Sequence, residues 1–388
     1  MKTGFFAIVA RSFRQIASRP LYWFALIVLP LGLFYFLAEM MEAGIPENAP
    51  AGIVDKDHTH MSRQMTQTLD AMQLVRITES CNSYSQAMDK VRSGEIFGFF
   101  LIPENYEADL LAGRSPVISF YTNMTYFVPG TLAYKNFKTV GVYTKAGVVM
   151  TALQSATGAT TGQIAPLINP VSIQGHPLNN PWLNYSYYLN NSFIPGVLQL
   201  MIFLLTAYTL GEEIKRGTSV RLMNMAGGSI LRAVTAKLIP QTLMWFVIAM
   251  FMESWLYGWN EYPMNGSMGW MLLSALMFVL ACQGFALFVT CVLPNLRLSL
   301  SVCALCGILT FSIAAYSFPV ESMYGAVGIF SWIVPARYNF LIYIDQALNG
   351  IDIYYSRYYF IAYMAFIFAP LTMLWNLKKA YLKPIYIP

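Results

Sequence analysis

Long apolar runs separated by short polar segments dominate the pattern of this sequence. Residues 20–38 form an uncharged run long enough for a helix to cross a hydrocarbon core of about 30 Å. Further runs of this kind, of which one is interrupted only by Glu253, cover residues 192–210, 238–259, 269–293, 298–320 and 358–377. The pattern predicts a polytopic α-helical membrane protein with six transmembrane helices, one followed by a group of five.

A shorter apolar segment, residues 321–336, lies before the last of these runs. It is too short and too rich in glycine and proline to cross a bilayer as a helix. We therefore expect a re-entrant hairpin here, inside a five-helix transmembrane domain that covers residues 192–377.

Basic residues set the direction of the chain, because Lys and Arg in short loops favour the cytoplasmic side. They gather before residue 20, in the loop 211–237 and in the tail 378–388. All three groups lie on one side if both termini are cytoplasmic. The same alternation places residues 39–191 outside the cytoplasm.

Residues 39–191 change abruptly to the composition of a soluble domain. Short apolar runs typical of strands alternate there with segments of helical spacing. Strands are expected near residues 51–54, 73–77, 96–103 and 116–123, and helices near 61–72, 84–95 and 104–113. This order predicts a small extracytoplasmic α/β domain between the first and second spans. Residues 134–163 also have a helical pattern, and a stretch rich in Pro and Asn, 166–191, leads back to the membrane.

The N-terminal segment 1–19 has the pattern of an amphipathic helix. Its apolar positions share one arc of the helical wheel, and Arg11 and Arg14 lie opposite. Such a helix lies in the cytoplasmic interface of a membrane, with arginines on anionic lipid headgroups. Arg11, Arg14 and Arg19 are therefore the predicted interfacial anchors, and Pro20 separates this helix from the first span.

Composition agrees with lipid as the solvent. Hydrophobic residues make up 56% of the 388 residues and charged residues only 11%, against about 25% charged residues in a typical soluble domain. The formal net charge of +5 is too small to imply a nucleic-acid partner. The five cysteines form no disulfide or metal pattern, and four of them lie in apolar runs as packing residues.

Two polar features are candidate sites. Glu253 is an acid inside an apolar run, and an intramembrane carboxylate is a candidate for a transport path or a proton acceptor. Near the outer end of its span it can also reach headgroup water. The pair His58 and His60 stands beside aspartates, as in some zinc sites, but turn and N-cap chemistry explains the segment without a metal, and we predict none.

The loop 211–237 resembles the cytoplasmic loop of the ABC-2 type transporter permease family. Matching positions are Glu213, Arg216, Gly217, Thr218 and Lys237, whereas the middle of the loop departs from the family pattern. Ser18-Arg19-Pro20 resembles the family's entry to its first span, and residues 317–338 resemble its phenylalanine-proline, hairpin and final proline. The segment 39–191 is similar to the long extracytoplasmic insertion of one subgroup of bacterial exporter subunits.

This resemblance implies a function. The chain would be the permease subunit of an ATP-binding cassette exporter in a bacterial inner membrane, moving an amphiphilic or hydrophobic substrate outward. The loop would couple it to the ATPase through a set of six residues: Glu212, Glu213, Lys215, Arg216, Gly217 and Thr218. The sequence has no P-loop motif, so ATP and Mg would bind to a separate ATPase subunit, and this chain would hold no cofactor and be no enzyme.

The family also implies a dimer with a second copy or a related permease, and in some relatives a periplasmic adaptor and an outer-membrane channel. Two alternatives remain open. One is a membrane receptor or assembly protein whose outer domain binds a ligand, and it predicts a signalling partner in place of an ATPase. The other is an intramembrane enzyme, which would need convergent catalytic groups at one interface, where the spans offer Glu253 and no histidine.

Overall fold

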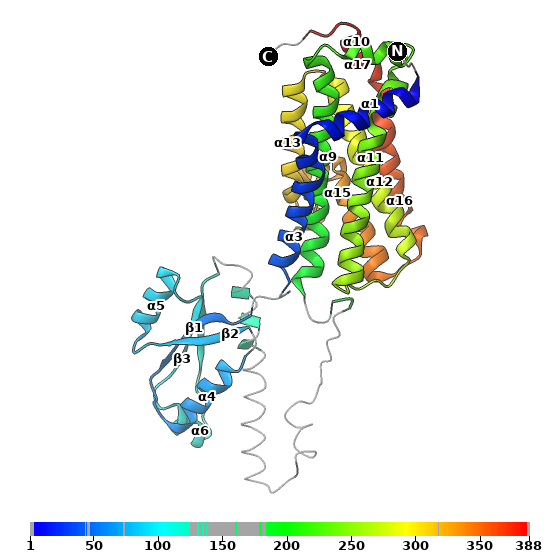
Figure 1. The fold of residues 1–388 in the computed structure, drawn as a ribbon. Coiled ribbons are helices and arrows are strands. Elements are labelled where there is room, and N and C mark those ends of the chain that lie inside the picture. Colours follow the sequence, from blue (N-terminus) through cyan, green and yellow to red (C-terminus); the bar gives the residue numbers. More distant parts are fainter. Residues whose placement is uncertain are drawn as a thin grey trace. The chain divides into compact units, whose positions relative to one another are not determined.

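A computed structural model describes the chain as two compact units, one mostly helical (Met1–Glu42 with Leu178–Pro388) and one with a β-sheet (Ala43–Pro177). We call them the helical unit and the α/β unit (Figure 1). The structure describes residues 4–42, 44, 47–72, 74–124, 130–131, 134–135, 137–138, 160, 178–180, 184–316 and 318–385. Nearly all of the predicted helical segment 134–163, and most of 166–191, lies outside these residues.

The helical unit contains five helices long and apolar enough to cross a membrane, or up to seven spans if each of two bent helix pairs is counted as one. The five are Pro20–Met40, Tyr185–Lys215, Ile230–Trp259, Met268–Val292 and Leu296–Ile313. They correspond to the first five predicted spans, which confirms a polytopic helical membrane protein. The predicted number of six lies within this range and stays a prediction.

These five spans contain named elements as follows. The first consists of α2 (Pro20–Trp23), the π-helical turn η1 (Phe24–Val28) and α3 (Leu29–Met40). The second is α9 (Tyr185–Lys215), and the third joins α11 (Ile230–Ser254) to the π-helical turn η2 (Trp255–Trp259). The fourth and fifth are α12 (Met268–Val292) and α13 (Leu296–Ile313).

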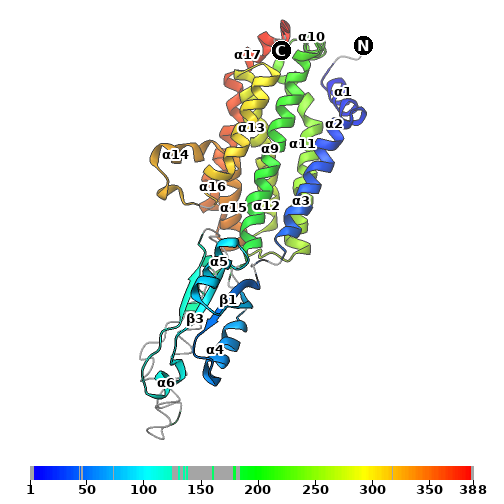
Figure 2. The same cartoon turned by 90° about the vertical axis from the view of Figure 1, so that its left-hand side faces the viewer.

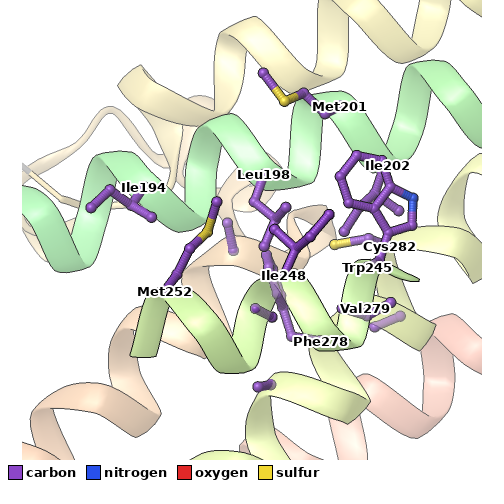
Figure 3. Packing of buried hydrophobic residues seen from close by; sticks show 14 of the residues in the cluster. Ile194, Leu198, Met201, Ile202, Trp245, Ile248, Met252, Phe278, Val279 and Cys282 are labelled. Atoms are coloured by element: carbon purple, nitrogen blue, oxygen red, sulfur yellow. The ribbon is translucent and has the colours of Figure 1, made fainter. Parts of the chain in front are cut away.

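The core of the helical unit is formed by large apolar side chains from α9, α11 and α12 (Figure 3). Trp245 and Ile202 are fully buried there, beside Cys282. Small residues let the helices approach closely. A Cβ atom on Gly284 of α12 would lie 2.4 Å from the carbonyl oxygen of Phe366, so only glycine fits this crossing.

The last third of the unit differs from the sequence-based expectation in two places. The predicted span 298–320 is too long, because α13 ends at Ile313 and Ala315 has a positive φ of 66°. The predicted span 358–377 is not one straight helix. It combines α16 (Ile353–Phe368), the 3-10 turn η6 (Ala369–Thr372) and the start of α17 (Leu374–Leu382), with a bend of 41°. Pro370 lies in the connecting turn, where it has no N–H to continue the helix.

The segment predicted as a re-entrant hairpin is irregular and short, with a bend of 83° between Gly325–Ile333 and Pro335–Asn349, as in a broken span or a re-entrant loop. It contains the 3-10 turns η3 (Val320–Ser322) and η4 (Ser331–Ile333) and the helix α14 (Gly325–Phe330), which projects to one side of the bundle (Figure 2). Beyond it the structure adds α15 (Pro335–Ile342) and the π-helical turn η5 (Tyr343–Asn349), which no sequence pattern singled out.

Three short elements gather at the end of the bundle where both chain termini lie (Figures 1 and 2). They are α1 (Phe5–Ser18), α10 (Ser219–Met225) and α17. The helix α1 runs across the bundle and not along it (Figure 1). It buries Ile8, Ser12 and Ile16 against the bundle and leaves Phe6 and Phe13 exposed. Ser219 donates a hydrogen bond to the carbonyl of Tyr381 (2.9 Å), which fastens α10 to α17.

The α/β unit is built on a four-stranded sheet in the order β2-β1-β3-β4. The strands are β1 (Ala49–Asp55), β2 (Val75–Ser80), β3 (Gly98–Ile102) and β4 (Ser119–Thr122). β1 is parallel to β2 and β3, and β4 is antiparallel to β3. The helices α4 (His60–Asp70) and α6 (Tyr106–Leu111) share one hydrophobic cluster with the sheet, and α5 (Tyr84–Ser93) packs in a second one. The predicted order of strands and helices in residues 49–122 is therefore confirmed.

The turn after β1 begins α4 by capping. Thr59 is the N-cap residue, and its side chain accepts a hydrogen bond from the backbone N–H of Ser62, whose hydroxyl accepts one from the N–H of Thr59. The Asp55 carboxylate accepts from Ser62 Oγ at 2.7 Å, and Asp57 accepts from Thr59 Oγ1 at 2.6 Å. Turn and cap chemistry therefore accounts for these aspartates. Within the described residues no cluster of His, Cys, Asp and Glu is arranged to hold a metal ion.

Candidate functional site

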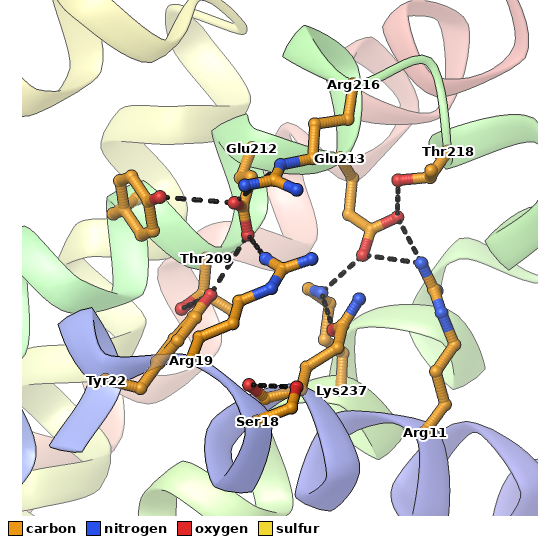
Figure 4. Close-up of polar contacts among 12 residues, drawn as sticks. Arg11, Ser18, Arg19, Tyr22, Thr209, Glu212, Glu213, Arg216, Thr218 and Lys237 are labelled. Atoms are coloured by element: carbon orange, nitrogen blue, oxygen red, sulfur yellow. Dashed lines mark hydrogen bonds and ion pairs between the residues drawn. The ribbon is translucent and has the colours of Figure 1, made fainter.

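The end of α9 carries two adjacent carboxylates that are buried, although both were predicted to lie in a cytoplasmic loop as residues that contact the ATPase. Glu213 is 2% exposed and Glu212 is 4% exposed. Burying a carboxylate is costly unless cations and hydrogen-bond donors surround it. The two acids and the cations that face them form a charge cluster (Figure 4). Its members are Glu212, Glu213, Arg11, Arg19, Arg216 and Lys237.

Glu213 joins three separate segments of the chain. Arg11 of α1 donates through Nη2 to Oε1 and Oε2 of Glu213, at 3.0 and 2.9 Å. Lys237 of α11, itself only 1% exposed, donates to Oε1 at 2.6 Å. Thr218, at the beginning of α10, donates to Oε2 at 2.6 Å. One carboxylate therefore ties α1, α10 and α11 to the end of α9.

Glu212 joins the entrance of the first span to the same place. Arg19 Nη1 lies 2.5 Å from its Oε2, and the hydroxyl of Tyr22 donates to that oxygen at 3.3 Å. On the other oxygen, Tyr208 donates at 3.1 Å and Arg216 Nε lies at 2.8 Å. Because all four partners donate to the charged carboxylate, they offset the loss of water around it.

The turn that follows depends on glycine. Gly217 has a φ of 65°, and its N–H donates to the carbonyl of Ile214 while that of Thr218 donates to the carbonyl of Glu213. This left-handed residue after a helix is the usual C-terminal cap, which glycine adopts without strain. The turn ends α9 and directs the chain into α10, whose Leu222 and Met223 are fully buried.

The six predicted coupling residues are therefore divided by the fold. Glu212 and Glu213 point inward, and Gly217 and Thr218 form the turn. Lys215 and Arg216 are exposed, and the side chain of Arg216 is 54% accessible. Beyond the predicted set, α10 exposes Val220, Arg221 and Asn224 at the same end.

The predicted interfacial arginines also have different surroundings. Arg14 is exposed, and its role as a lipid anchor stays a prediction. Arg11 and Arg19 are engaged with Glu213 and Glu212, which sequence reasoning missed. A signal was present in the sequence. Lys237 directly precedes an uncharged run, and a charge at such a position needs a partner.

Glu253, the predicted transport-path candidate, is half-buried near the opposite end of α11 from Lys237. It lines a cavity of about 40 Å³ among α9, α11, α12, α15 and η5. Its Oε2 atom is buried and accepts no hydrogen bond from the described residues. It is far along the helix from the charge cluster, so the structure does not bring the two predicted sites together.

The fold and these charges define the class of protein: a multi-pass helical membrane protein with buried ion pairs at one end of its bundle and an inserted α/β unit. Comparison with known families gives the rest. The model of the ABC-2 family transporter protein matches residues 20–375, so the chain belongs to this family. It is thus the membrane subunit of an ABC transporter, and membership implies a separate ATPase subunit.

Two curated relatives were found at the same similarity. The probable multidrug ABC transporter permease YbhS of Escherichia coli strain K12 is 21% identical over 344 residues, covering 86% of this chain and 85% of that protein. The protein of the same name from Escherichia coli O157:H7 has the same identity and coverage.

Proposed function

We propose that this chain is the permease subunit of an ABC exporter that moves an amphiphilic or hydrophobic compound out of the cytoplasm or the inner leaflet. A separate subunit hydrolyses the ATP that drives the movement. The proposal rests mainly on the charge cluster, together with the family of the chain and the name of the curated relatives.

The charge cluster gives α10 the connections that a coupling element needs. If α10 had no side-chain contacts to the bundle, its displacement would bend the connecting segments and would not move the transmembrane helices. Here Thr218 at the start of α10 holds the Glu213 carboxylate, which also holds Arg11 of α1 and Lys237 of α11. Displacing α10 therefore either moves α9, α11 and α1 with it or breaks buried ion pairs, which is expensive.

The orientation follows from the same elements. We place the end with α1, α10 and α17 on the cytoplasmic side, since the basic residues of the helical unit gather there. Both termini are then cytoplasmic, Arg14 contacts lipid headgroups, and the α/β unit between the first two spans is extracytoplasmic. The membrane in this proposal is the bacterial inner membrane, which the chain crosses with six spans and one re-entrant segment.

The proposal includes partners. The ATPase subunit docks on the exposed face of α10 and the turn before it, and it carries ATP and Mg, whereas this chain carries no cofactor. A second permease copy or a related chain completes the transporter. A periplasmic adaptor and an outer-membrane channel are the partners we propose for the α/β unit.

Copurification tests the docking face. The full-length chain, extracted from its native cells in mild detergent, should bring an ATP-hydrolysing subunit with it. The variant Arg221→Glu should lose most of that subunit, because this side chain is exposed and lies outside the charge cluster, and charged rim residues govern encounter and complementarity. Glu212 and Glu213 are unsuitable for this purpose, since changing either disturbs the fold.

A matched control separates docking from net charge. Arg92→Glu introduces the same reversal on the α/β unit, where Arg92 is 75% exposed, and should leave the ATPase bound. Loss of the ATPase from this control as well would refute α10 as the docking face. If no ATPase accompanies the well-folded unaltered chain, the exporter proposal fails and a receptor role should be tested next.

A further inference from the structure

The cavity beside Glu253 combines one carboxylate with aromatic and thioether walls. Apolar lining comes from Met252, Met271, Phe278 and Leu198, of which Figure 3 labels Met252, Phe278 and Leu198. The polar lining is contributed by Glu253, Asn191, Asn339, Tyr257 and Tyr343. The lining contains one acid and no Lys, Arg or His among the described residues.

Three side chains of the lining donate their hydrogen bonds to atoms other than Glu253. The hydroxyl of Tyr257 donates to Asn191 Oδ1 at 2.9 Å, and that of Tyr343 donates to the carbonyl of Tyr187 at 2.8 Å. Asn191 Nδ2 also donates to that carbonyl, at 2.9 Å. Glu253 Oε2 is consequently a buried acceptor with no donor in the described part of the chain. A ligand that donates hydrogen bonds or carries a positive charge would supply the partner that Glu253 Oε2 needs.

Irregular backbone surrounds the same cavity. Pro195 lies inside α9 and lines the cavity, and it has no N–H to offer to the carbonyl of Asn191 four residues earlier. Directly after Glu253, α11 changes into the π-helical turn η2 at Trp255. Single π-helical turns are uncommon and occur frequently at functional sites. The helices therefore depart from regular geometry on two sides of this carboxylate.

The volume and the lining of this cavity indicate which kind of cation would fit beside Glu253. About 40 Å³ holds roughly three water-sized groups, which suits a substituted ammonium group but not a whole drug-sized molecule. A metal ion such as Na⁺ or Ca²⁺ prefers a shell of oxygen ligands, whereas most of this lining is aromatic or aliphatic. An ammonium group with its first methylenes instead gains from aromatic faces and from a carboxylate.

We infer that the cavity beside Glu253 binds the ammonium group of an amine-bearing amphiphile, whose apolar tail extends toward the lipid. This inference rests on the proposed export function, and it specifies the substrate class: cationic amphiphiles are bound in preference to neutral ones of the same length. Glu253 is the specificity-determining residue, because it is the acid of the cavity and carries the negative charge when an ammonium group is bound.

Binding to the full-length chain in lipid nanodiscs tests the inference without any ATPase. The probes are n-hexylammonium and 1-hexanol, which share a tail and differ in charge, and the readout is equilibrium dialysis. Glu253→Gln should weaken hexylammonium binding by about tenfold or more, the loss expected for a charge-assisted hydrogen bond, and leave hexanol binding unchanged. This variant should fold, since it keeps the size of the side chain and removes an acid that has no cation beside it in the described part of the chain.

Two further variants make the result specific. Glu261→Gln makes the same change in an exposed loop residue shortly after η2 and should bind hexylammonium like the unaltered chain. Ala275→Leu keeps Glu253 but fills the cavity from α12, and should reduce hexylammonium binding. Equal binding of the two probes to the unaltered chain, or equal hexylammonium binding before and after Glu253→Gln, would overturn the inference.

Transport separates this inference from the proposed function. In proteoliposomes with the ATPase, ATP-dependent export of a neutral amphiphile but not of a cationic one preserves the export function and refutes the amine site. Amine binding in nanodiscs without ATP-dependent export of any amphiphile supports the site and refutes the proposed function.

Discussion

Replacing Glu213 by Gln keeps the size of the side chain but removes the charge that Lys237 and Arg11 share. Arg11 and Lys237 then differ in their access to water. Arg11 is 18% exposed and can turn toward water. Lys237 is 1% exposed and keeps only neutral acceptors, namely Gln15 Oε1 at 3.2 Å and the amide oxygen of the new glutamine. Removing one partner of a buried ion pair typically costs about 3–5 kcal/mol, because the other charge stays buried. We expect Glu213→Gln to destabilise the helical unit by an amount in this range.

The double variant Glu213→Gln with Lys237→Met distinguishes an unpaired charge from a lost contact. Methionine has a similar length and needs no counter-charge, so the double variant should recover most of the lost stability. Lys237→Met alone should cost less than Glu213→Gln, since Glu213 keeps Arg11 and Thr218.

Thermal unfolding in one lipid or detergent system, followed by tryptophan fluorescence, ranks these variants. Glu261→Gln is the matched control, because it makes the same change at an exposed residue of the helical unit and should cost no more than about 1 kcal/mol. The reasoning is refuted if the double variant is less stable than Glu213→Gln, or if Glu213→Gln is as mild as the control.

Two other predictions test packing and the α/β unit. Gly284→Val should destabilise the helical unit by about 1–3 kcal/mol, because its Cβ would approach the Phe366 carbonyl oxygen, while Gly32→Val, in open space on α3, should have little effect on the melting temperature. Burial alone would raise the pKa of Asp57, but hydrogen bonds from Thr59 and nearby backbone N–H groups outweigh it and lower that pKa. The stabilisation is therefore present above the unfolded pKa of about 4 and is lost as the pH falls through the folded value. Asp57→Asn should speed hydrogen exchange of the α4 amides at pH 7 relative to the unaltered chain, and a difference that does not shrink below pH 4 would contradict this.

The hydrophobic pattern predicted most of the helical unit correctly. In lipid, a long uncharged run forms a helix because a helix satisfies the backbone hydrogen bonds within the segment. The same pattern failed where apolar composition continues but the backbone turns. The run after Leu298 stays apolar to Val320 although the helix ends at Ile313. In the last run, Pro370 divides what composition alone would join. The predicted strand and helix order of the α/β unit succeeded because its elements are short, regular and separated by clear turn residues.

The candidate site was less accessible to sequence reasoning. The pattern identified Glu213 and Arg11 separately, one as a loop charge and one as a lipid anchor. Their pairing joins positions 202 residues apart in the chain, and a single sequence contains nothing that links such distant positions. Glu253 was recognisable as an acid in an apolar run, but whether it faced lipid, water or a cavity depended on how four helices pack around it.

The distance along the chain between the members of the charge cluster has a consequence for biosynthesis. Arg11 leaves the ribosome early, and at about 5–20 residues per second its partner Glu213 follows roughly 10–40 seconds later. Lys237 is made later still, so none of the three can be buried until α9 and α11 have both entered the membrane. Until then, we expect α1 to lie on the membrane surface through its exposed apolar side chains. The cluster can thus form only late in assembly, and a chain that misinserts either helix leaves these charges without their partners.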